Sequence, residues 1–217
     1  MMLAVSTTDG INLNRHPRSD YHHGDLQNAL ITAGRRLLAA RGVDALSLRE
    51  AAREAGVSTA APYRHFASKE ALLAAMAAQG FQELSRAFEG ALRRRRTSPA
   101  LLRLAEAYVS FARSDPHTYR LMFRMPQHAY ATYDELRESA GMAFSRLASA
   151  YDEYLGVTGG DPGTAVRGSV GVWSLVHGFA LLTIDEQAAF VGVENLPDIA
   201  DLFGLIPQFG QQQTIRK

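Results

Sequence analysis

Residue types that serve in catalysis occur along this chain, but not at the spacing that catalysis requires. Gly168-Ser169-Val170-Gly171 places a serine among glycines without the G-x-S-x-G spacing of a hydrolase nucleophile. The glycine-rich segment 159–163 lacks the Lys-Ser/Thr pair of a phosphate-binding loop. The seven histidines form no HExxH motif, and no cysteine is present. We therefore expect no enzymatic activity, no metal site and no cofactor.

A different chemistry is indicated by residues 47–66, which read SLREAAREAGVSTAAPYRHF. Ser47, with Glu50 three residues later, is typical of a capping box at the start of a short helix. Gly56 allows a tight reversal after this helix, and Ser58 is suited to cap a second one. A second short helix with an exposed, capped start fits the major groove of DNA. The small core that fixes the crossing angle is expected from Leu48, Ala52, Ala55, Val57 and Phe66.

Helical periodicity and cap residues extend over most of the chain. From Asp25 onward, apolar residues recur every three to four positions, and Gly42 is suited to end this first helix. Ser68 is suited to cap a long helix that ends in the arginine run 93–96. No stretch shows the alternation of a strand, so we predict an all-α fold. The expected helices cover about residues 25–41, 48–55, 58–65, 69–96, 99–113, 116–124, 129–155, 163–187 and 196–206.

Residues 25–72 resemble the DNA-binding domain of the TetR family of transcriptional regulators. Each matching piece is weak by itself, and the combination carries the resemblance. It implies an N-terminal three-helix helix-turn-helix domain that binds double-stranded DNA, and most members of the family repress transcription. The matching pieces are Leu26, Leu30, Ala33 and Leu37, then Gly42, Ser47-Leu48-Arg49-Glu50, Ala55-Gly56-Val57-Ser58, Tyr63-Arg64-His65-Phe66 and Ser68-Lys69-Glu70.

The resemblance also implies roles for single residues. Arginine can bond guanine bidentately, and an alanine methyl can meet a thymine methyl. Pro62 stands where the family usually has an aliphatic residue; it leaves the first helical turn possible but crowds Ala61. The positions that face the groove in such proteins are Thr59, Ala60, Ala61 and Arg64. The positions that contact or lie near phosphates are Ser47, Arg49, Tyr63, His65 and Lys69.

Residues 116–123 and 173–178 resemble one C-terminal domain type of the same family, named for its Trp-His-Gly signature. Trp173 and His177 lie four residues apart and share one helix face. In one interpretation they are walls of an apolar site for a small-molecule effector, with methionine and aromatic side chains opposite. In the other they only pack, with the imidazole bonded to a buried carbonyl. The candidate ligand-binding set is Tyr108, Phe111, Tyr119, Met122, Phe123, Trp173 and His177.

The last two expected helices are more apolar than a solvated helix, so part of their surface must meet the core and part a partner. In TetR-like proteins the equivalent pair forms a four-helix interface. The resemblance therefore implies a homodimer whose two-fold symmetry matches a palindromic operator. The apolar stripe consists of Val170, Trp173, Val176, Leu181, Ile184, Leu202, Phe203 and Ile206.

Composition sets the remaining expectations. The 217 residues carry a net charge of +1, and residues 15–70 hold nine Lys/Arg against six Asp/Glu, which allows a nucleic-acid face there. No apolar run reaches the ~18 residues of a spanning helix, and the start does not read as a signal peptide, so a cytoplasmic location is expected. The expected organisation is a flexible arm (1–19), a helix-turn-helix domain (20–70), a helical regulatory, ligand-binding and dimerisation domain (71–210) and a flexible tail (211–217).

These patterns together predict a sequence-specific transcriptional regulator, a repressor that a small, largely apolar ligand releases from a palindromic operator. The long fourth helix would couple the two domains. The alternatives are a helical dimeric interaction protein or a nucleoid-associated protein without a small-molecule effector. The C-terminal domain could equally be a dimerisation module alone. Salt-sensitive binding to one palindrome would separate these readings.

Overall fold

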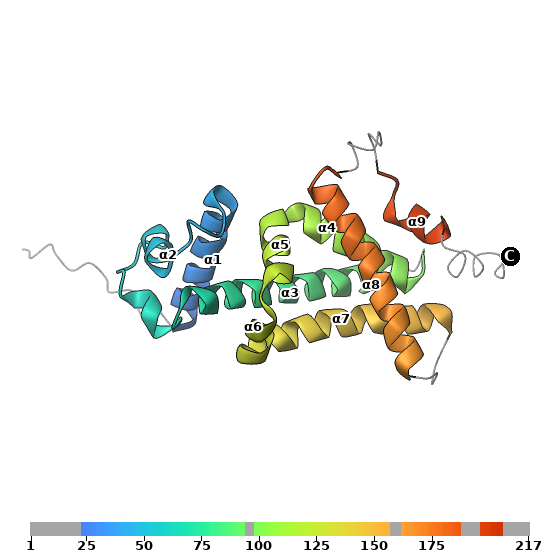
Figure 1. Ribbon diagram of the computed structural model, residues 1–217, viewed down its shortest axis with the longest axis horizontal. Helices are drawn as coiled ribbons and strands as arrows, with labels where there is room; N and C mark the ends of the chain where they lie inside the picture. The colour runs from blue at the N-terminus through green and yellow to red at the C-terminus, as the bar shows by residue number, and fades with distance from the viewer. Residues whose placement is uncertain (1–22, 94–97, 157–161, 188–195, 206–217) are drawn as a thin grey trace, which may run out of the picture.

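The computed structural model describes residues 23–93, 98–156, 162–187 and 196–205, and every regular element in these ranges is helical, as predicted (Figure 1). The expected arm (1–19) and tail (211–217), and Ile206 of the stripe, lie outside the described residues. The elements are α1 (His23–Arg41), α2 (Leu48–Glu54), the 3₁₀ helix η1 (Ala61–Arg64), α3 (Lys69–Arg93), α4 (Ala100–Ser114), α5 (Pro116–Arg124), α6 (Gln127–Thr132), α7 (Asp134–Leu155), α8 (Pro162–Ile184) and α9 (Ile199–Leu205).

Two serine caps begin the helices for which the sequence predicts them. The Ser47 hydroxyl accepts a hydrogen bond from the Glu50 N–H (3.1 Å), and the Ser68 hydroxyl accepts one from the Ala71 N–H (3.1 Å). Each bond satisfies one N–H that the first turn leaves unpaired. The Glu50 carboxylate pairs with Arg53, so only one half of the predicted capping box is seen among the described residues.

The first two helices end at glycines that adopt the left-handed conformation, as predicted. Gly42 has φ +76° and Gly56 has φ +70°, a region that costs a residue with a Cβ free energy. The reversals bring α1, α2 and the start of α3 together around one apolar cluster. Its deeply buried members include Leu30, Leu46, Ala51, Ala52, Phe66 and Leu72.

The predicted third helix, 58–65, is wrong in type and length. The structure has a turn at Thr59 and Ala60 and then only the 3₁₀ helix η1. Ser58 gives no side-chain cap; its backbone carbonyl accepts from the Ala61 N–H (3.0 Å). The cause is Pro62, which has no N–H and disfavours the α conformation at the residue before it. A short 3₁₀ turn needs only i→i+3 bonds and fits this sequence.

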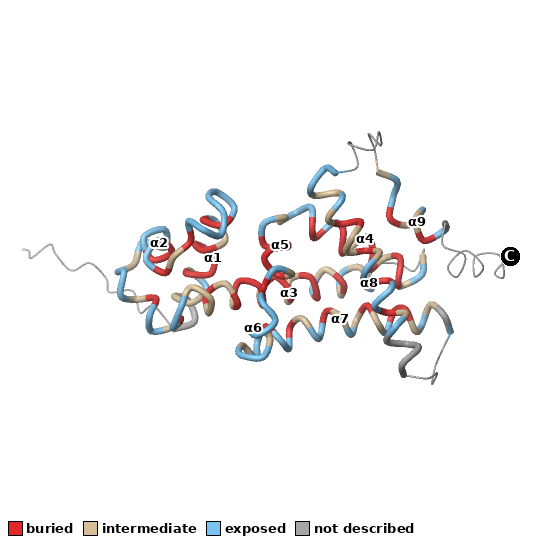
Figure 2. The backbone as a smooth tube through the Cα atoms, viewed as in Figure 1, coloured by how far each residue is buried: buried red, intermediate tan, exposed pale blue. Residues whose placement is uncertain are grey.

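Helix α3 joins the two halves of the molecule (Figures 1 and 2). Its first turns pack against α1, and the rest packs against α4, α5 and α7. Gly80 allows α5 to approach α3 closely, because a Cβ there would lie 2.6 Å from Met122 Sδ and 2.9 Å from Thr118 Cγ2. The C-terminal half is a bundle of α3, α4, α7 and α8, with α9 lying on α4.

The single helix predicted for residues 129–155 is also wrong, because the structure has α6 and α7 with a break at Tyr133. Tyr133 adopts an extended conformation (φ −109°, ψ 100°), and its hydroxyl donates to Glu70 Oε1 at 3.2 Å. His128 of α6 contacts the same carboxylate (3.0 Å). The break therefore places α6 against the first turn of α3. The last helix also begins later than predicted, at Ile199.

Replacing Gly168 by alanine is expected to destabilise the protein by about 1–3 kcal/mol, because the added Cβ overlaps a rigid ring. A Cβ on Gly168 would lie 2.2 Å from Cε1 of the buried Tyr151. The control is Gly90→Ala, whose Cβ meets nothing within 4 Å; it should stabilise by about 0.5–1 kcal/mol. Urea unfolding at one protein concentration measures both. Equal shifts in the two variants would contradict this account of the α7–α8 contact.

Candidate nucleic-acid interface and ligand cavity

Residues 58–65, here called the recognition segment, present side chains on the surface at the end of the molecule formed by α1 and α2. Tyr63 is 54% exposed, and Thr59, Ala60 and Arg64 are exposed as well. Ala61 and His65 are half-buried, while Pro62 is buried and anchors the segment. An exposed aromatic ring beside an exposed arginine is suited to contact a nucleic acid, because the ring gains by leaving water and the arginine can bind phosphate or a base.

The three flanking residues predicted to lie near phosphates have different surroundings. Arg49 is exposed on α2. The hydroxyl of Ser47 serves as the cap of α2, and the Lys69 ammonium donates to the backbone carbonyl of Val43 (2.6 Å). Ser47 therefore stabilises the first turn of α2, and Lys69 links the first turn of α3 to the loop between α1 and α2.

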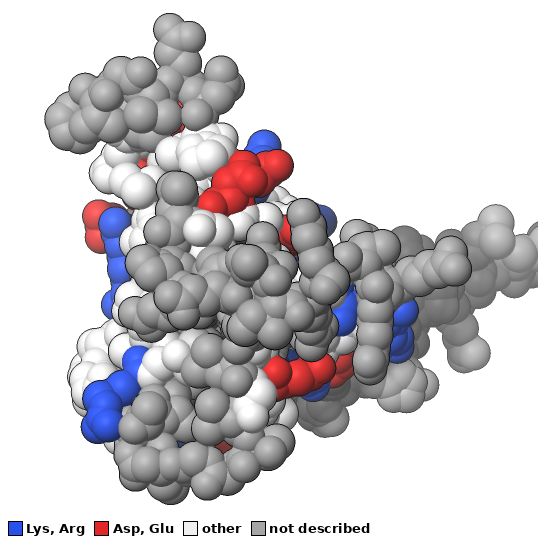
Figure 3. Space-filling view, turned by 90° about the vertical axis from the view of Figure 1, so that its right-hand side faces the viewer, with Lys and Arg blue, Asp and Glu red and all other residues white. Residues whose placement is uncertain are grey.

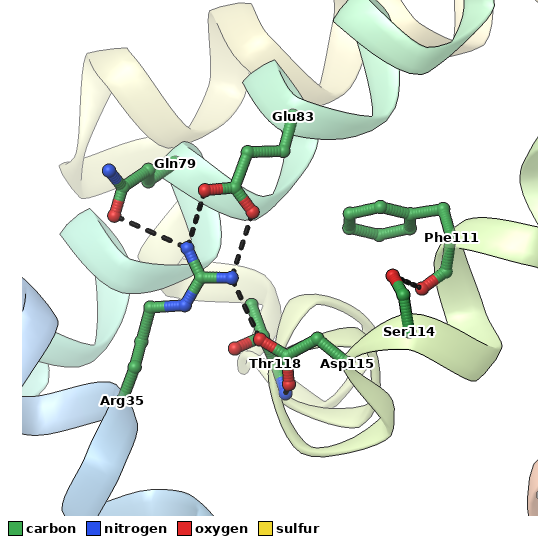
Figure 4. Close-up of polar contacts among 7 residues, drawn as sticks. All are labelled: Arg35, Gln79, Glu83, Phe111, Ser114, Asp115 and Thr118. Atoms are coloured by element: carbon green, nitrogen blue, oxygen red, sulfur yellow. Dashed lines mark hydrogen bonds and ion pairs between the residues drawn. The ribbon is translucent and has the colours of Figure 1, made fainter.

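Sequence reasoning did not identify the polar cluster that joins α1 to the C-terminal half (Figure 4). The Arg35 guanidinium of α1 forms a bidentate pair with Glu83 of α3 (2.6 and 2.8 Å). The same group donates to Asp115 Oδ2 (2.7 Å), and Asp115 Oδ1 accepts from the Thr118 N–H (3.0 Å) as the N-cap of α5. One arginine thus connects three helices. No sequence signal singles it out, because its partners lie 48 and 80 positions away.

The charges of this cluster support one another. The hydrogen bond to Glu83 raises the pKa of Arg35 above its ordinary value, although burial opposes this. Burial alone would raise the pKa of Asp115, but the hydrogen bonds from Arg35 and Thr118 outweigh it and hold that pKa below its ordinary value. Both groups are therefore charged at neutral pH.

A second polar cluster lies among the aromatic residues of α4, α5 and α8. The Tyr119 hydroxyl lies 2.7 Å from His177 Nδ1, and the Tyr108 hydroxyl lies 3.0 Å from the same nitrogen. The two hydroxyls are 3.2 Å apart, and the Trp173 indole N–H donates to the Tyr108 hydroxyl over 3.4 Å. Among the described residues, the imidazole therefore bonds to tyrosine hydroxyls, and no carbonyl is among its partners. Phe123 packs edge-on to it, with ring centres 4.4 Å apart.

This second cluster is uncharged at neutral pH. Burial lowers the pKa of His177 below its ordinary value, which favours the neutral imidazole. Burial raises the pKa of Tyr108 to about 12, and it raises that of Tyr119 as well. Trp173 and His177 lie on the same side of α8, with ring centres 5.9 Å apart.

A cavity of about 560 Å³ lies between α3, α4, α5, α6, α7 and α8. Its volume falls within the range of small-molecule sites. Among the predicted ligand residues, Tyr108, Phe123 and Trp173 line it, whereas Phe111, Tyr119, Met122 and His177 lie outside its lining. The lining residues from α3 are Phe81, Leu84 and Phe88. Their helical spacing in the sequence marks them only as core residues. The lining residues are Phe81, Leu84, Phe88, Tyr108, Phe123, Met125, Gln127, Tyr130, Ala140, Gly141, Ala143, Phe144, Leu147, Val170 and Trp173.

Comparison with known proteins identifies both halves of the chain. Residues 30–76 match the sequence profile of bacterial regulatory proteins of the tetR family, and residues 101–204 match the profile described as tetracyclin repressor-like, C-terminal domain. The chain belongs to the TetR family. It is accordingly a DNA-binding transcriptional regulator with an N-terminal helix-turn-helix and a C-terminal helical domain.

One curated protein and two solved structures illustrate what this chain is similar to. YobS of Bacillus subtilis (strain 168), an HTH-type transcriptional regulator, is 25% identical over 164 residues, which cover 75% of this chain and 81% of YobS. The structure of a Rhodococcus sp. RHA1 protein of unknown function is 31% identical with a TM-score of 0.69, covering 90% of this chain and 98% of that one. A TetR/AcrR regulator from Thermobifida fusca YX-ER1 shares the fold at 18% identity, with a TM-score of 0.54 and coverage of 82% and 92%.

In this TetR-family chain the predicted apolar stripe divides between core and surface. Val176 and Phe203 are fully buried within the chain. Val170 is 41% exposed, and Leu182, which the prediction did not include, is exposed to the same extent. The remaining described members, Trp173, Leu181, Ile184 and Leu202, are half-buried.

The described surface contains few other candidate sites. No group of three or more His, Cys, Asp or Glu in the described ranges could hold a metal ion, and no helix in those ranges is long and apolar enough to cross a membrane. The end of the molecule remote from α2 carries small, separate groups of Lys/Arg and Asp/Glu in its described part (Figure 3). Among the described residues seen from this side, these groups do not merge into one extended basic face.

Proposed function

We propose that this TetR-family protein is a repressor that binds a palindromic operator as a homodimer and is released by a small, largely apolar ligand. One observation carries the proposal. The same chain holds an exposed Tyr63-Arg64 pair in the recognition segment and, further along α3, an apolar cavity of about 560 Å³. The first feature suits a DNA contact and the second a small molecule.

In this proposal Arg64 bonds a guanine edge, and Thr59, Ala60 and Ala61 lie against the neighbouring bases. Tyr63, Arg49 and His65 contact phosphates or the sugar backbone. The N–H groups at the starts of α2 and α3, near Ser47 and Lys69, add phosphate contacts that fix the register without reading sequence.

The proposed release runs through α5 as well as through α3. A ligand in the cavity contacts Phe123 of α5, and the first turn of α5 is held to α1 through Asp115 and Arg35. Arg120 of α5 also donates to the carbonyl of Ile184 at the end of α8 (3.1 Å). A shift of α5 would therefore move α1, and with it the recognition segment, relative to the second subunit.

The proposed dimer uses the exposed face of α8, where Val170 and Leu182 lie unburied. Burial of this face against a second copy would place two recognition segments about one helical turn of DNA (~34–36 Å) apart, or a multiple of it. A protein that binds promoter DNA works in the compartment that holds the chromosome, so we propose a cytoplasmic location.

The test is a genome-wide pull-down with the purified chain, followed by gel shifts on the best-enriched sequence at two salt concentrations. We expect tight, salt-sensitive binding to one palindrome, because phosphate contacts release counterions. Weak binding that is the same for all sequences would instead favour a nucleoid-associated role. Sedimentation of the free protein and of the complex gives the number of subunits.

A further inference from the structure

The residues that line the cavity indicate the charge of its ligand. None of the fifteen lining residues that the structure describes is Asp, Glu, Lys, Arg or His. An ion that enters such a site loses its hydration and finds no counter-charge, which costs several kcal/mol or more. The cavity therefore suits an uncharged ligand.

The aromatic side chains of the lining indicate an aromatic ligand. Seven of the fifteen lining residues are aromatic, and they come from six different helices. Rings that approach from several directions can contact a flat ligand ring with their faces and edges. Such ring contacts contribute binding free energy beyond that of apolar burial. Ring contacts among them already follow this geometry, since Phe144 lies edge-on to Trp173 with ring centres 6.0 Å apart.

Few polar groups border the cavity, and they differ in what they already bind. The Tyr130 hydroxyl donates to the carbonyl of Met122 (2.7 Å), so its proton is used. The Trp173 N–H points to the Tyr108 oxygen. Gln127 is exposed to solvent. Tyr108, which is only 2% exposed, is thus the buried hydroxyl whose proton decides what the site can bind.

The proton of Tyr108 can pass to a ligand without leaving a donor of its cluster unpaired. The Tyr119 hydroxyl donates to the Tyr108 oxygen (3.2 Å), and the Tyr108 hydroxyl lies 3.0 Å from His177 Nδ1. With the imidazole proton on Nε2, Nδ1 has one lone pair, and in the free protein the Tyr108 hydroxyl donates to it. A ligand acceptor that takes the Tyr108 proton leaves Nδ1 to the Tyr119 hydroxyl, which lies only 2.7 Å from it.

From these observations we infer that the effector is an uncharged aromatic molecule with a hydrogen-bond acceptor, such as an aromatic ketone, and that the Tyr108 hydroxyl donates to this acceptor. Tyr119 and His177 keep Tyr108 in position from outside the cavity. The inference rests on the proposed function, because it names the chemical class of the ligand that releases the operator.

The test is calorimetric titration of the full-length protein with three probes of similar size: butyrophenone, butylbenzene and 4-phenylbutanoate. In the Tyr108→Phe variant we expect the affinity for butyrophenone to fall about ten-fold, because one well-formed buried hydrogen bond is lost. The affinity for butylbenzene, which has no acceptor, should not change. Tyr130→Phe is the matched control, because it removes a lining hydroxyl whose proton is already used, and it should leave the preference intact. 4-Phenylbutanoate should bind wild-type protein most weakly.

Location is tested with Ala140→Phe, which fills the cavity and should abolish butyrophenone binding. Trp173 is the only tryptophan in the chain, so its emission reports occupancy directly. The inference is overturned if no probe binds, if the anion binds best, if Tyr108→Phe weakens both neutral probes equally, or if Ala140→Phe still binds. A gel shift of the unliganded wild-type protein separates the ligand proposal from the proposed repressor function. If the protein binds its operator and one of these outcomes is also observed, only the proposed ligand class is overturned.

Discussion

Replacement of Tyr63 and Arg64 by alanine should lower operator affinity about 100-fold, since a bidentate arginine–guanine contact alone contributes about 1–3 kcal/mol. Both side chains are exposed, and no hydrogen bond or ion pair to another described residue holds either of them. Truncation therefore removes the proposed DNA contacts without removing contacts that stabilise the fold. The free energy of unfolding should change by no more than about 0.5 kcal/mol.

Gel shifts on the selected palindrome and on a scrambled duplex measure this effect. Arg113→Ala is the matched control, because it removes an exposed arginine from α4, away from the recognition segment. The operator affinity of this variant should stay within about two-fold of the wild-type value, because salt screens a charge that lies far from the DNA. Full operator affinity in the Tyr63/Arg64 variant would rule out the recognition segment as the DNA-reading element.

Arg35→Met is expected to lower the free energy of unfolding by about 2–4 kcal/mol, because it leaves two carboxylates close together without their counter-charge. The side chains of Arg35, Glu83 and Asp115 are only 20–29% exposed, so solvent compensates for the loss only in part. Arg36→Met is the control. The neighbouring Arg36 is 68% exposed and lies 3.9 Å from Glu54, so its loss should cost at most about 0.5 kcal/mol.

The pH dependence of unfolding distinguishes loss of this charge cluster from loss of packing. In wild-type protein the pKa of Asp115 is depressed by folding. Its contribution is fully present above the unfolded carboxyl pKa of about 3.9 and is lost as pH falls through the lower folded value. In Arg35→Met, Asp115 loses the arginine that lowers its pKa and lies close to another carboxylate, so burial raises the pKa of Asp115. The variant should therefore gain stability as pH falls from about 6 toward 4.

A rescue variant completes this test. Adding Glu83→Gln and Asp115→Asn to Arg35→Met removes both unpaired charges, and asparagine still caps a helix. Most of the lost stability should return, and the inverted pH dependence should disappear. If the rescue variant is no more stable than Arg35→Met, the cost comes from lost packing of the arginine stem and not from charge.

The positions at which helices begin and end were largely predictable from the sequence. Ser47, Ser68, Gly42 and Gly56 act within four residues of their own position, so the chain needs no distant partner to use them. The all-α class and the helix-turn-helix follow from the same local signals. The prediction failed at Pro62, whose effect on Ala61 turned an expected α-helix into a 3₁₀ turn, and at Tyr133, whose hydroxyl binds a carboxylate 63 positions away.

The tertiary structure alone decided which inward-facing residues meet and where packing leaves space. The sequence analysis grouped Tyr108, Tyr119 and His177 in one candidate set, but their shared hydrogen bonds depend on how three helices cross. The same holds for Arg35, whose partners Glu83 and Asp115 are far away in sequence. A cavity is the volume that several helices together fail to fill, so no single segment encodes it. Local signals fix helices because their contacts lie within one turn, whereas a site between helices exists only once the chain has folded.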